Sequence, residues 1–432
     1  MQRLFALSFV LLACVCSAFA QLSAQDRDRG LIMLKAARDD IKNKYYDPTY
    51  RGIDLEARTK LAEERIKQAK SNGEVFGVIA QMLLEFNDSH TLFYPPARSA
   101  RIEYGWQMQT FGDHTYVIAV KPKSDAEAKG LKAGDRVLKI DGIAPNRSNL
   151  WIYYYLYGAL SPRPVVRMEV LSPGAEPRLM EVNAKVTPGK KIFDFTDTID
   201  LNAYMRDLED EARMSEHKIV EIGENVAIWR MTSFDLTEDS VDNAVNKVKK
   251  FKTLILDLRR NGGGSEETLL RLIGNFFDRD ITVGKIKRRK EEKPLIAKTR
   301  GDSGFKNSLV VLVDSESGSA SEVFASVIQS EKRGAILGDR TSGKVMRSRF
   351  YSHQIGLETV VRYGVSVTDA DLILPDGKSL EGAGVTPNEV LLPTGEDLRA
   401  LQDTVLSRAV VAAGGTLDPT EAGKLFPFKW KP

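Results

Sequence analysis

The chain has 432 residues, 28% of them charged, and its formal net charge at pH 7 is only +3. Because the charge is nearly balanced, nothing in the composition points to nucleic acid as a partner. Both cysteines, Cys14 and Cys16, lie within the first twenty residues, so the remainder of the chain can hold no disulfide, zinc–thiolate centre or cysteine nucleophile. A chain of this length typically divides into about three domains.

Residues 1–20 have the features of a signal peptide. A basic residue precedes an apolar run at 4–15, and the small-residue motif Ala-Phe-Ala at 18–20 predicts cleavage before Gln21. A bilayer-spanning helix needs about twenty apolar residues, so we expect an exported protein, periplasmic or secreted, without a transmembrane anchor. The alternative is a lipoprotein, because a lipobox-like Leu-Leu-Ala-Cys motif ends at Cys14.

The next segment, residues 21–95, is predicted to be a helical domain. Its apolar residues recur at steps of three and four, which is the period of an amphipathic helix. They are Ile32, Leu34, Ile41, Val75, Phe76, Ile79, Met82 and Leu83.

Residues 96–188 are predicted to form a small domain of short strands and tight turns. Strand-like runs at 116–120 and 136–140 flank a short helix at 125–129. Residues 128–142 resemble a PDZ domain, specifically the circularly permuted kind of bacterial processing proteases, although another small sheet with a helix would show similar turns. PDZ domains bind a peptide's C-terminal strand at a sheet edge. The residues expected to contact such a peptide are Tyr104, Gly105 and Trp106.

From residue 189 to 432, strands and helices alternate, which predicts an α/β domain. Ligands of such sheets bind at the carboxyl ends of the strands. The predicted strands are 226–231, 253–258, 309–313 and 335–338, and the predicted helices are 237–249, 266–277 and 320–329.

Two turns of this domain could carry chemistry. The first, residues 257–265, contains three consecutive glycines whose exposed amides could hold an oxyanion or a phosphate. Phosphate is the weaker interpretation, since the P-loop Lys-Ser/Thr is missing. In the second turn, 315–322, Ser319 and Glu322 have the spacing of a capping box. A serine at a helix N-terminus is also well placed to be a nucleophile, but it requires a base.

Lys344 is the best candidate for that base. It follows the strand 335–338 through a turn, and a right-handed crossover would bring it to the same sheet edge as Ser319. The four histidines show no catalytic pattern; His90 belongs to the predicted helical segment. To act as a base, a lysine must be neutral, so burial must lower its pKa from about 10.4 towards 7 to 8.

Taken together, these motifs resemble the carboxyl-terminal processing, or tail-specific, peptidase family over nearly the whole mature chain. The order of the motifs makes the match specific. The matching segments are 87–91, the PDZ-like run, 257–264, 317–322, 338–344, 375–377 and 381–385.

The resemblance implies a multidomain α/β protein whose core is related to crotonase and Clp protease. It implies that Ser319 is the nucleophile and Lys344 the base, with the amides of Ala320 and Gly264 as the oxyanion hole; Gly263 is the alternative to Gly264. It also implies polypeptide substrates, a cut near their C-termini, and no metal or organic cofactor. The resemblance is also compatible with a homo-oligomer.

The chain departs from the family at several positions near the expected base, including residues 345–347, where the family usually has small residues. The family often has phenylalanine where Ser342 stands, and a glutamine that orients the lysine where Ser348 stands. Ser348 is therefore the candidate orienting residue. Because of this departure, a catalytically weak or inactive peptide-binding protein on the same scaffold is the alternative function, and a nucleotide-binding enzyme is a third.

Overall fold

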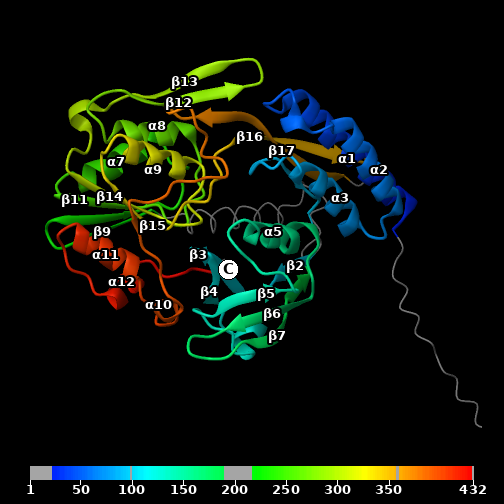
Figure 1. Cartoon of the computed structure of the whole chain (residues 1–432), viewed down its shortest axis with the longest axis horizontal. Helices are drawn as coiled ribbons and strands as arrows, with labels where there is room; N and C mark the ends of the chain where they lie inside the picture. The colour runs from blue at the N-terminus through cyan, green and yellow to red at the C-terminus, as the bar shows by residue number, and fades with distance from the viewer. Residues whose placement is uncertain (1–21, 98–99, 189–216, 357–359, 431–432) are drawn as a thin grey trace, which may run out of the picture.

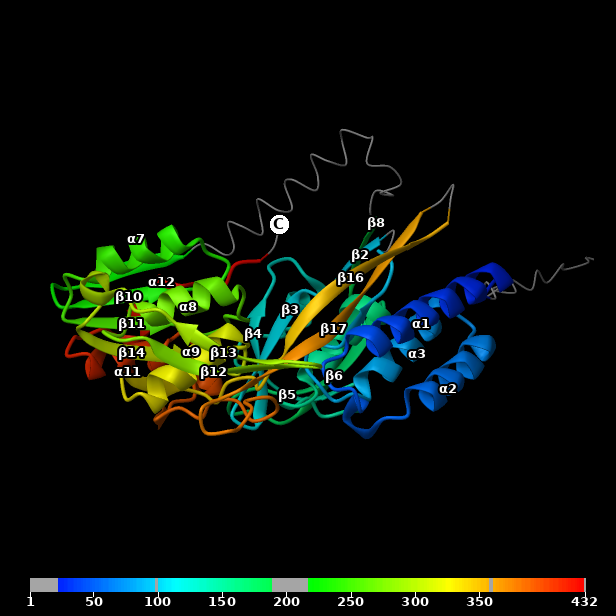
Figure 2. The same cartoon turned by 90° about the horizontal axis from the view of Figure 1, so that it is seen from above.

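A computed structural model describes residues 22–97, 100–188, 217–356 and 360–430 (Figures 1 and 2). Its architecture is mixed α/β in several units, as expected. Within these ranges, no helix is both long and apolar enough for a membrane crossing.

The first unit contains three helices, each of which begins after a capping side chain, from Ser23, Asp54 and Ser71 respectively. Its apolar core is shared with strands from the far end of the chain, since Tyr363 and Val365 are buried in the same cluster. The predicted helical segment is therefore not packed independently. The elements are α1 (Ala24–Lys44), the short η1 (Tyr50–Gly52), α2 (Leu55–Gln68), α3 (Asn72–Leu84) and β1 (Leu92–Tyr94).

The second unit is a five-stranded antiparallel sheet in the order β3-β4-β5-β6-β7. One edge strand, β3, faces the core domain rather than solvent, as Figure 1 shows. The elements are β2 (Ala100–Glu103), β3 (Trp106–Phe111), β4 (His114–Val120), α4 (Asp125–Ala128), β5 (Arg136–Ile140), α5 (Leu150–Tyr155), the π-turn η2 (Leu156–Leu160), β6 (Val165–Leu171), β7 (Arg178–Asn183) and β8 (Lys185–Pro188).

The core is a six-stranded sheet in the order β18-β15-β14-β11-β10-β9, parallel except for β9. Helices α7, α8 and α9 cover one face, while α11 and α12 cover the other. All four predicted strands and all three predicted helices are confirmed. The elements are β9 (Lys218–Ile222), β10 (Val226–Arg230), α7 (Glu238–Val248), β11 (Thr253–Asp257), α8 (Glu266–Gly274), η3 (Gly301–Ser303), β14 (Ser308–Val313), α9 (Ala320–Ser330), β15 (Ala335–Gly338), β18 (Glu389–Val390), α10 (Gly395–Arg399), α11 (Thr404–Ala412) and α12 (Pro419–Leu425).

A second sheet joins the core to the helical unit. Its longest strand, β17, pairs with β16 along one edge and with β1 and β12 at successive stretches of the other edge, so it ties residues 92–94 to the core (Figure 2). The strands are β12 (Ile281–Arg288), β13 (Glu292–Ala297), β16 (Arg347–Ile355) and β17 (Val361–Ile373). The long hairpin β16–β17 starts three residues after Lys344 and thereby places the helical unit beside that lysine.

Candidate active site

Ser319 occupies a strained turn between β14 and α9. It stands at the N-cap of α9, but its φ of 53° and ψ of −118° differ from the extended backbone of an ordinary N-cap. A residue other than glycine seldom adopts a positive φ, and such strain is concentrated at functional sites. Although the Gly-x-Ser-x-Gly sequence is missing, the backbone forms a sharp strand-to-helix turn that presents a serine.

The carboxylate of Glu322 holds this turn against the turn that carries Lys344. It is fully buried and accepts hydrogen bonds from the amides of Ser319 (3.1 Å), Gly343 (2.7 Å) and Lys344 (2.8 Å). The hydroxyls of Thr341 and Ser342 donate to it as well. Burial raises the pKa of Glu322, and these donors oppose the rise. Sequence reasoning gave Glu322 only the role of a helix cap.

The backbone of Lys344 lies beside that of Ser319, since the Ser319 amide donates to the Lys344 carbonyl over 2.8 Å. Its ammonium lies 5.3 Å from the ring centroid of Trp151 on α5. Burial lowers the pKa of Lys344, although the carboxylates of Glu322 and Glu381 favour the charged form. Among the described residues, no hydrogen bond joins its ammonium to the Ser319 hydroxyl. Lys344 is thus buried, as a lysine base must be, but its ammonium does not contact the Ser319 hydroxyl.

The glycine loop packs directly against Ser319. A Cβ on Gly263 would lie 2.6 Å from the Cβ of Ser319, so only glycine permits this approach. The Gly263 amide donates to the Asn261 side chain over 2.9 Å and is therefore not available to stabilise an oxyanion. The amides of Gly264 and Ala320, by contrast, find no acceptor within the ranges that the structure describes. Uncommitted amides beside a nucleophile are what an oxyanion hole requires, so Gly264 fits that role better than Gly263.

His90 shares a pocket with Lys344, which sequence reasoning did not foresee. The Ser89 hydroxyl lies 2.6 Å from His90 Nδ1 and donates to Glu381 Oε2 over 3.0 Å. A hydroxyl that donates to the carboxylate accepts from Nδ1–H, which leaves Nε2 with a free lone pair. Burial lowers the pKa of His90; the Asp88 carboxylate opposes this shift, and the neighbouring Lys344 adds to it. The neutral ring is therefore a second candidate base.

The other predicted site residues lie elsewhere. Ser348 is on β16 opposite Thr368, and in the described chain no hydrogen bond joins it to Lys344. The Trp106 side chain is buried in the core of the antiparallel sheet, where its ring centroid lies 5.3 Å from that of Tyr104. The Gly105 carbonyl accepts from Lys121. These contacts are internal to the sheet.

Two adjoining pockets border Lys344 and form one cleft. The smaller, of about 320 Å³, is bordered by His90, Tyr154 and Gly318, and we call it the Tyr154 pocket. The larger, of about 620 Å³, extends towards Arg340 and is called the Arg340 pocket. The residues that border both pockets are Ser89, Arg147, Trp151, Ser342 and Lys344.

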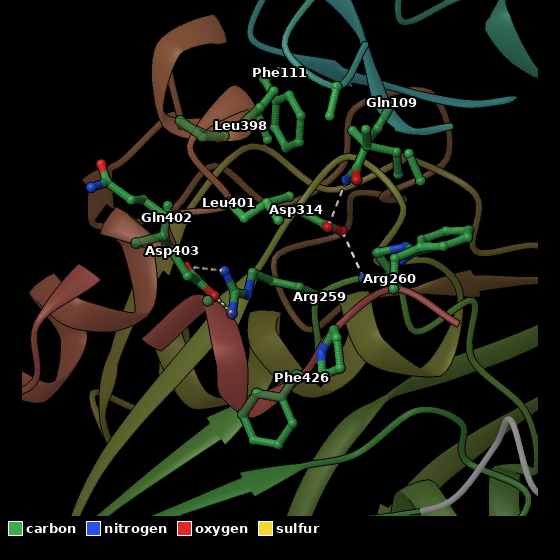
Figure 3. Close-up of a pocket in the computed structure, with 18 of the residues that line it drawn as sticks. Gln109, Phe111, Arg259, Arg260, Asp314, Leu398, Leu401, Gln402, Asp403 and Phe426 are labelled. Carbon is green, nitrogen blue, oxygen red and sulfur yellow. Dashed lines mark hydrogen bonds and ion pairs between the residues drawn. The ribbon is translucent and has the colours of Figure 1, made fainter. Parts of the chain in front are cut away.

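A separate cavity of about 790 Å³ lies across β3 from this cleft (Figure 3). The Gln109 side chain crosses it to donate to Asp314 over 2.7 Å, and Arg259 forms an ion pair with Asp403. Lys344, which borders both pockets of the cleft, does not border this cavity. The cleft that Lys344 borders is therefore the candidate active site.

Comparisons with known proteins point to the same chemistry. Residues 225–391 match the model of peptidase family S41. The chain is 25% identical over 338 residues to a carboxyl-terminal-processing protease of Picosynechococcus sp., covering 74% of each chain. It is 27% identical over 399 residues to a chloroplastic C-terminal processing peptidase of Tetradesmus obliquus, covering 84% of this chain and 77% of the relative.

Two solved structures share the fold. The structure of mature CPAF has a TM-score of 0.65 at 15% identity and covers 87% of this chain and 95% of its own. The photosystem II D1 C-terminal processing protease has a TM-score of 0.51 at 20% identity, with coverage of 85% and 94%.

Proposed function

We propose that this chain, whose residues 225–391 match peptidase family S41, is a serine endopeptidase that cuts exported proteins near their C-termini through an acyl-enzyme. The observation that carries the proposal is the Ser319 turn. The backbone of this serine is strained, and one buried carboxylate fastens it to the turn that carries the lysine. Two backbone amides beside it have no acceptor in the described ranges. These are the groups that acyl transfer needs.

In the first step, Ser319 Oγ attacks the scissile carbonyl while the base removes its proton. The carbonyl oxygen becomes an oxyanion, which the amides of Gly264 and Ala320 stabilise. The tetrahedral intermediate then collapses, and the protonated base gives its proton to the leaving amine. Water, activated by the same base, attacks the ester carbonyl and releases the shortened substrate and free Ser319.

Lys344 is the proposed base, and its burial supports this role. To act, its side chain must lose a proton and leave the ring of Trp151 for the Ser319 hydroxyl. Trp151 belongs to α5, so the contact that the Lys344 side chain must leave is one between the core and the antiparallel sheet unit. The arrangement in the structure is thus a resting one.

His90 is the competing base. The Ser89–Glu381 pair holds its ring, and neutral imidazole needs no large pKa shift to accept a proton at pH 7. Comparing Lys344→Ala with His90→Ala decides between the two. The variant of the true base should lose about a thousandfold or more in kcat, given that general base catalysis contributes about 10² to 10⁴, while the other variant should keep most of its activity.

The remaining features fit an exported, tail-directed peptidase. We assign residues 1–20 to a signal peptide cleaved before Gln21, residues 21–95 to a helical domain, 96–188 to a PDZ-like domain and 189–432 to the peptidase core. The signal segment lies outside the described residues. Support for the PDZ-like unit comes from its five antiparallel strands and the helix α5 beside the edge strand β3.

The test is hydrolysis of an unfolded protein with an apolar C-terminal tail, followed by mass spectrometry of the fragments. Wild type should release short C-terminal fragments, and Ser319→Ala should release none while its circular dichroism spectrum stays unchanged. If wild type binds such tails tightly and never cuts them, the chain is instead a non-catalytic binding protein on this scaffold.

A further inference from the structure

The Arg340 pocket is bordered by several charged side chains, and not all of them are paired with another residue of the described chain. Most of them already have partners within the described chain: Asp88 accepts from Tyr45, Asp371 accepts from Ser379, and Glu381 accepts from Ser89. The charged side chains that border this pocket are Arg51, Arg147, Arg340, Lys344, Asp88, Asp113, Asp371 and Glu381.

The positively charged side chains of this pocket differ in the partners that they contact. Arg147 forms an ion pair with Asp339 at 2.6 Å, and Arg51 donates to the carbonyl of Asn87 over 2.6 Å. Lys344 rests on the Trp151 ring. The guanidinium of Arg340 has no hydrogen bond or ion pair to any residue in the described ranges. Its backbone, however, is held firmly, because its carbonyl accepts from Arg147 over 2.7 Å.

The strand edge where a PDZ-like unit would add a peptide is already occupied. The Met108 amide donates to the Tyr154 hydroxyl over 2.8 Å, and that hydroxyl donates to the Met108 carbonyl over 2.7 Å. Further along β3, the Thr110 carbonyl accepts from Ser315. In this arrangement, β3 offers an incoming tail no free pair of backbone groups at these positions.

From these two observations we infer that Arg340 binds the terminal carboxylate of the substrate tail. This inference rests on the proposed function, and it names the feature of the substrate that the cleft reads. A guanidinium pairs with a carboxylate through two parallel N–H donors, a geometry that a carboxamide cannot match. The firmly held backbone at Arg340 fixes where that carboxylate lies relative to the turn of Ser319 and Lys344.

The position of Arg340 also limits where the chain is cut. Arg340 and Lys344 are joined by four peptide steps, which span at most about 14 Å when extended. A tail that lies along this turn, with its carboxylate on Arg340, places a bond near Ser319 about three to six residues from the terminus. The enzyme would therefore remove short tails of defined length.

Direct binding to the inactive Ser319→Ala chain tests this assignment without requiring catalysis. The probe is a fluorescein-labelled decapeptide ending in alanines, prepared as the free acid and as the carboxamide, and the readout is fluorescence polarisation. We expect the acid to bind about tenfold to a hundredfold more tightly. Equal Kd values for acid and amide would overturn the inference.

Double variants on the same background identify the residue. Ser319→Ala with Arg340→Gln should reduce acid binding to the level of the amide and leave the amide unchanged, whereas Arg340→Lys should retain part of the preference. Asp113→Asn, which removes an exposed anion that borders the same pocket, should strengthen acid binding. Arg408→Gln, on α11 outside the pocket, is the matched control and should change neither Kd. If Arg340→Gln weakens the binding of both peptides equally, the inference is also overturned.

The outcomes separate this inference from the proposed function. If wild type cuts tailed substrates but Ser319→Ala shows no preference for the acid, the peptidase assignment stands and the Arg340 assignment fails. If Ser319→Ala prefers the acid through Arg340 and wild type cuts nothing, the carboxylate site stands and the peptidase assignment fails.

Discussion

The Ser319 amide donates to the Lys344 carbonyl over 2.8 Å, so the proposed nucleophile and base are joined through their backbones and not through their side chains. The two turns therefore move as one piece. Only the lysine side chain has to swing for the dyad to form, and the ring of Trp151 holds it away.

The dependence of kcat/KM on pH should report which base acts. The pKa of Lys344 is lowered from its ordinary 10.5, so a lysine-dependent enzyme gains activity as pH rises through that lowered value. The pKa of His90 is lowered from 6.5, so a histidine-dependent enzyme already reaches its plateau near neutral pH. We expect activity still rising above pH 7, measured with a fluorogenic tailed peptide. A plateau that begins below pH 6.5 would assign the base to His90.

Removing the carboxylate of Glu322 should damage both stability and activity. In Glu322→Gln, an amide NH₂ faces amide and hydroxyl donors that the carboxylate now satisfies. We expect the free energy of unfolding in urea to fall by about 2–3 kcal/mol and kcat to fall about a hundredfold or more, because both turns lose their common anchor. Glu331→Gln, at the other end of α9, should cost less than about 1 kcal/mol because its partner Arg279 is exposed. Similar stability losses in both variants would contradict the role of Glu322.

The glycine loop offers a graded series of alanine variants. Gly264→Ala places a Cβ 2.7 Å from Asp235 at a φ of 140°, so it should displace the loop and lower kcat about 10² to 10³-fold, as loss of an oxyanion donor does. Gly263→Ala should be equally harmful, since it collides with Ser319. Gly262→Ala meets no atom within 4 Å and should fold with wild-type stability. Steady-state kinetics and thermal unfolding on the three variants check this order.

Asp88 should be a structural residue despite its place beside the cleft. Its carboxylate accepts from the Tyr45 hydroxyl (2.8 Å), the Thr368 hydroxyl (2.7 Å) and the His90 amide (3.0 Å), and it therefore links α1, β17 and the His90 loop. Asp88→Asn should lower the free energy of unfolding by about 2–3 kcal/mol. The control Asp113→Asn changes an exposed residue and should have little effect on stability. Unfolding of both variants in urea gives the comparison, and an unchanged midpoint for Asp88→Asn would exclude this role.

The sequence was most informative where local pattern decides structure. The alternation of buried strands and amphipathic helices located every predicted core element, and the glycine and serine turns stood out because their composition is unusual. The hairpin β16–β17 was not foreseen, although it brings the helical unit to Lys344. The contacts of Ser89 with Glu381 and of Lys344 with Trp151 were also hidden, because each joins segments that are far apart in the sequence and belong to different predicted domains. No local periodicity encodes such pairings.

The core shared by the N-terminal helices and β17 has a consequence for the chain during its synthesis. Ribosomes release the N-terminal helices first, yet these helices complete their packing only with residues 363–367, and the Ser89 loop requires Glu381. A nascent chain therefore lacks an assembled site. The enzyme cannot attack its own unfolded segments or its neighbours until nearly the whole polypeptide has emerged and folded.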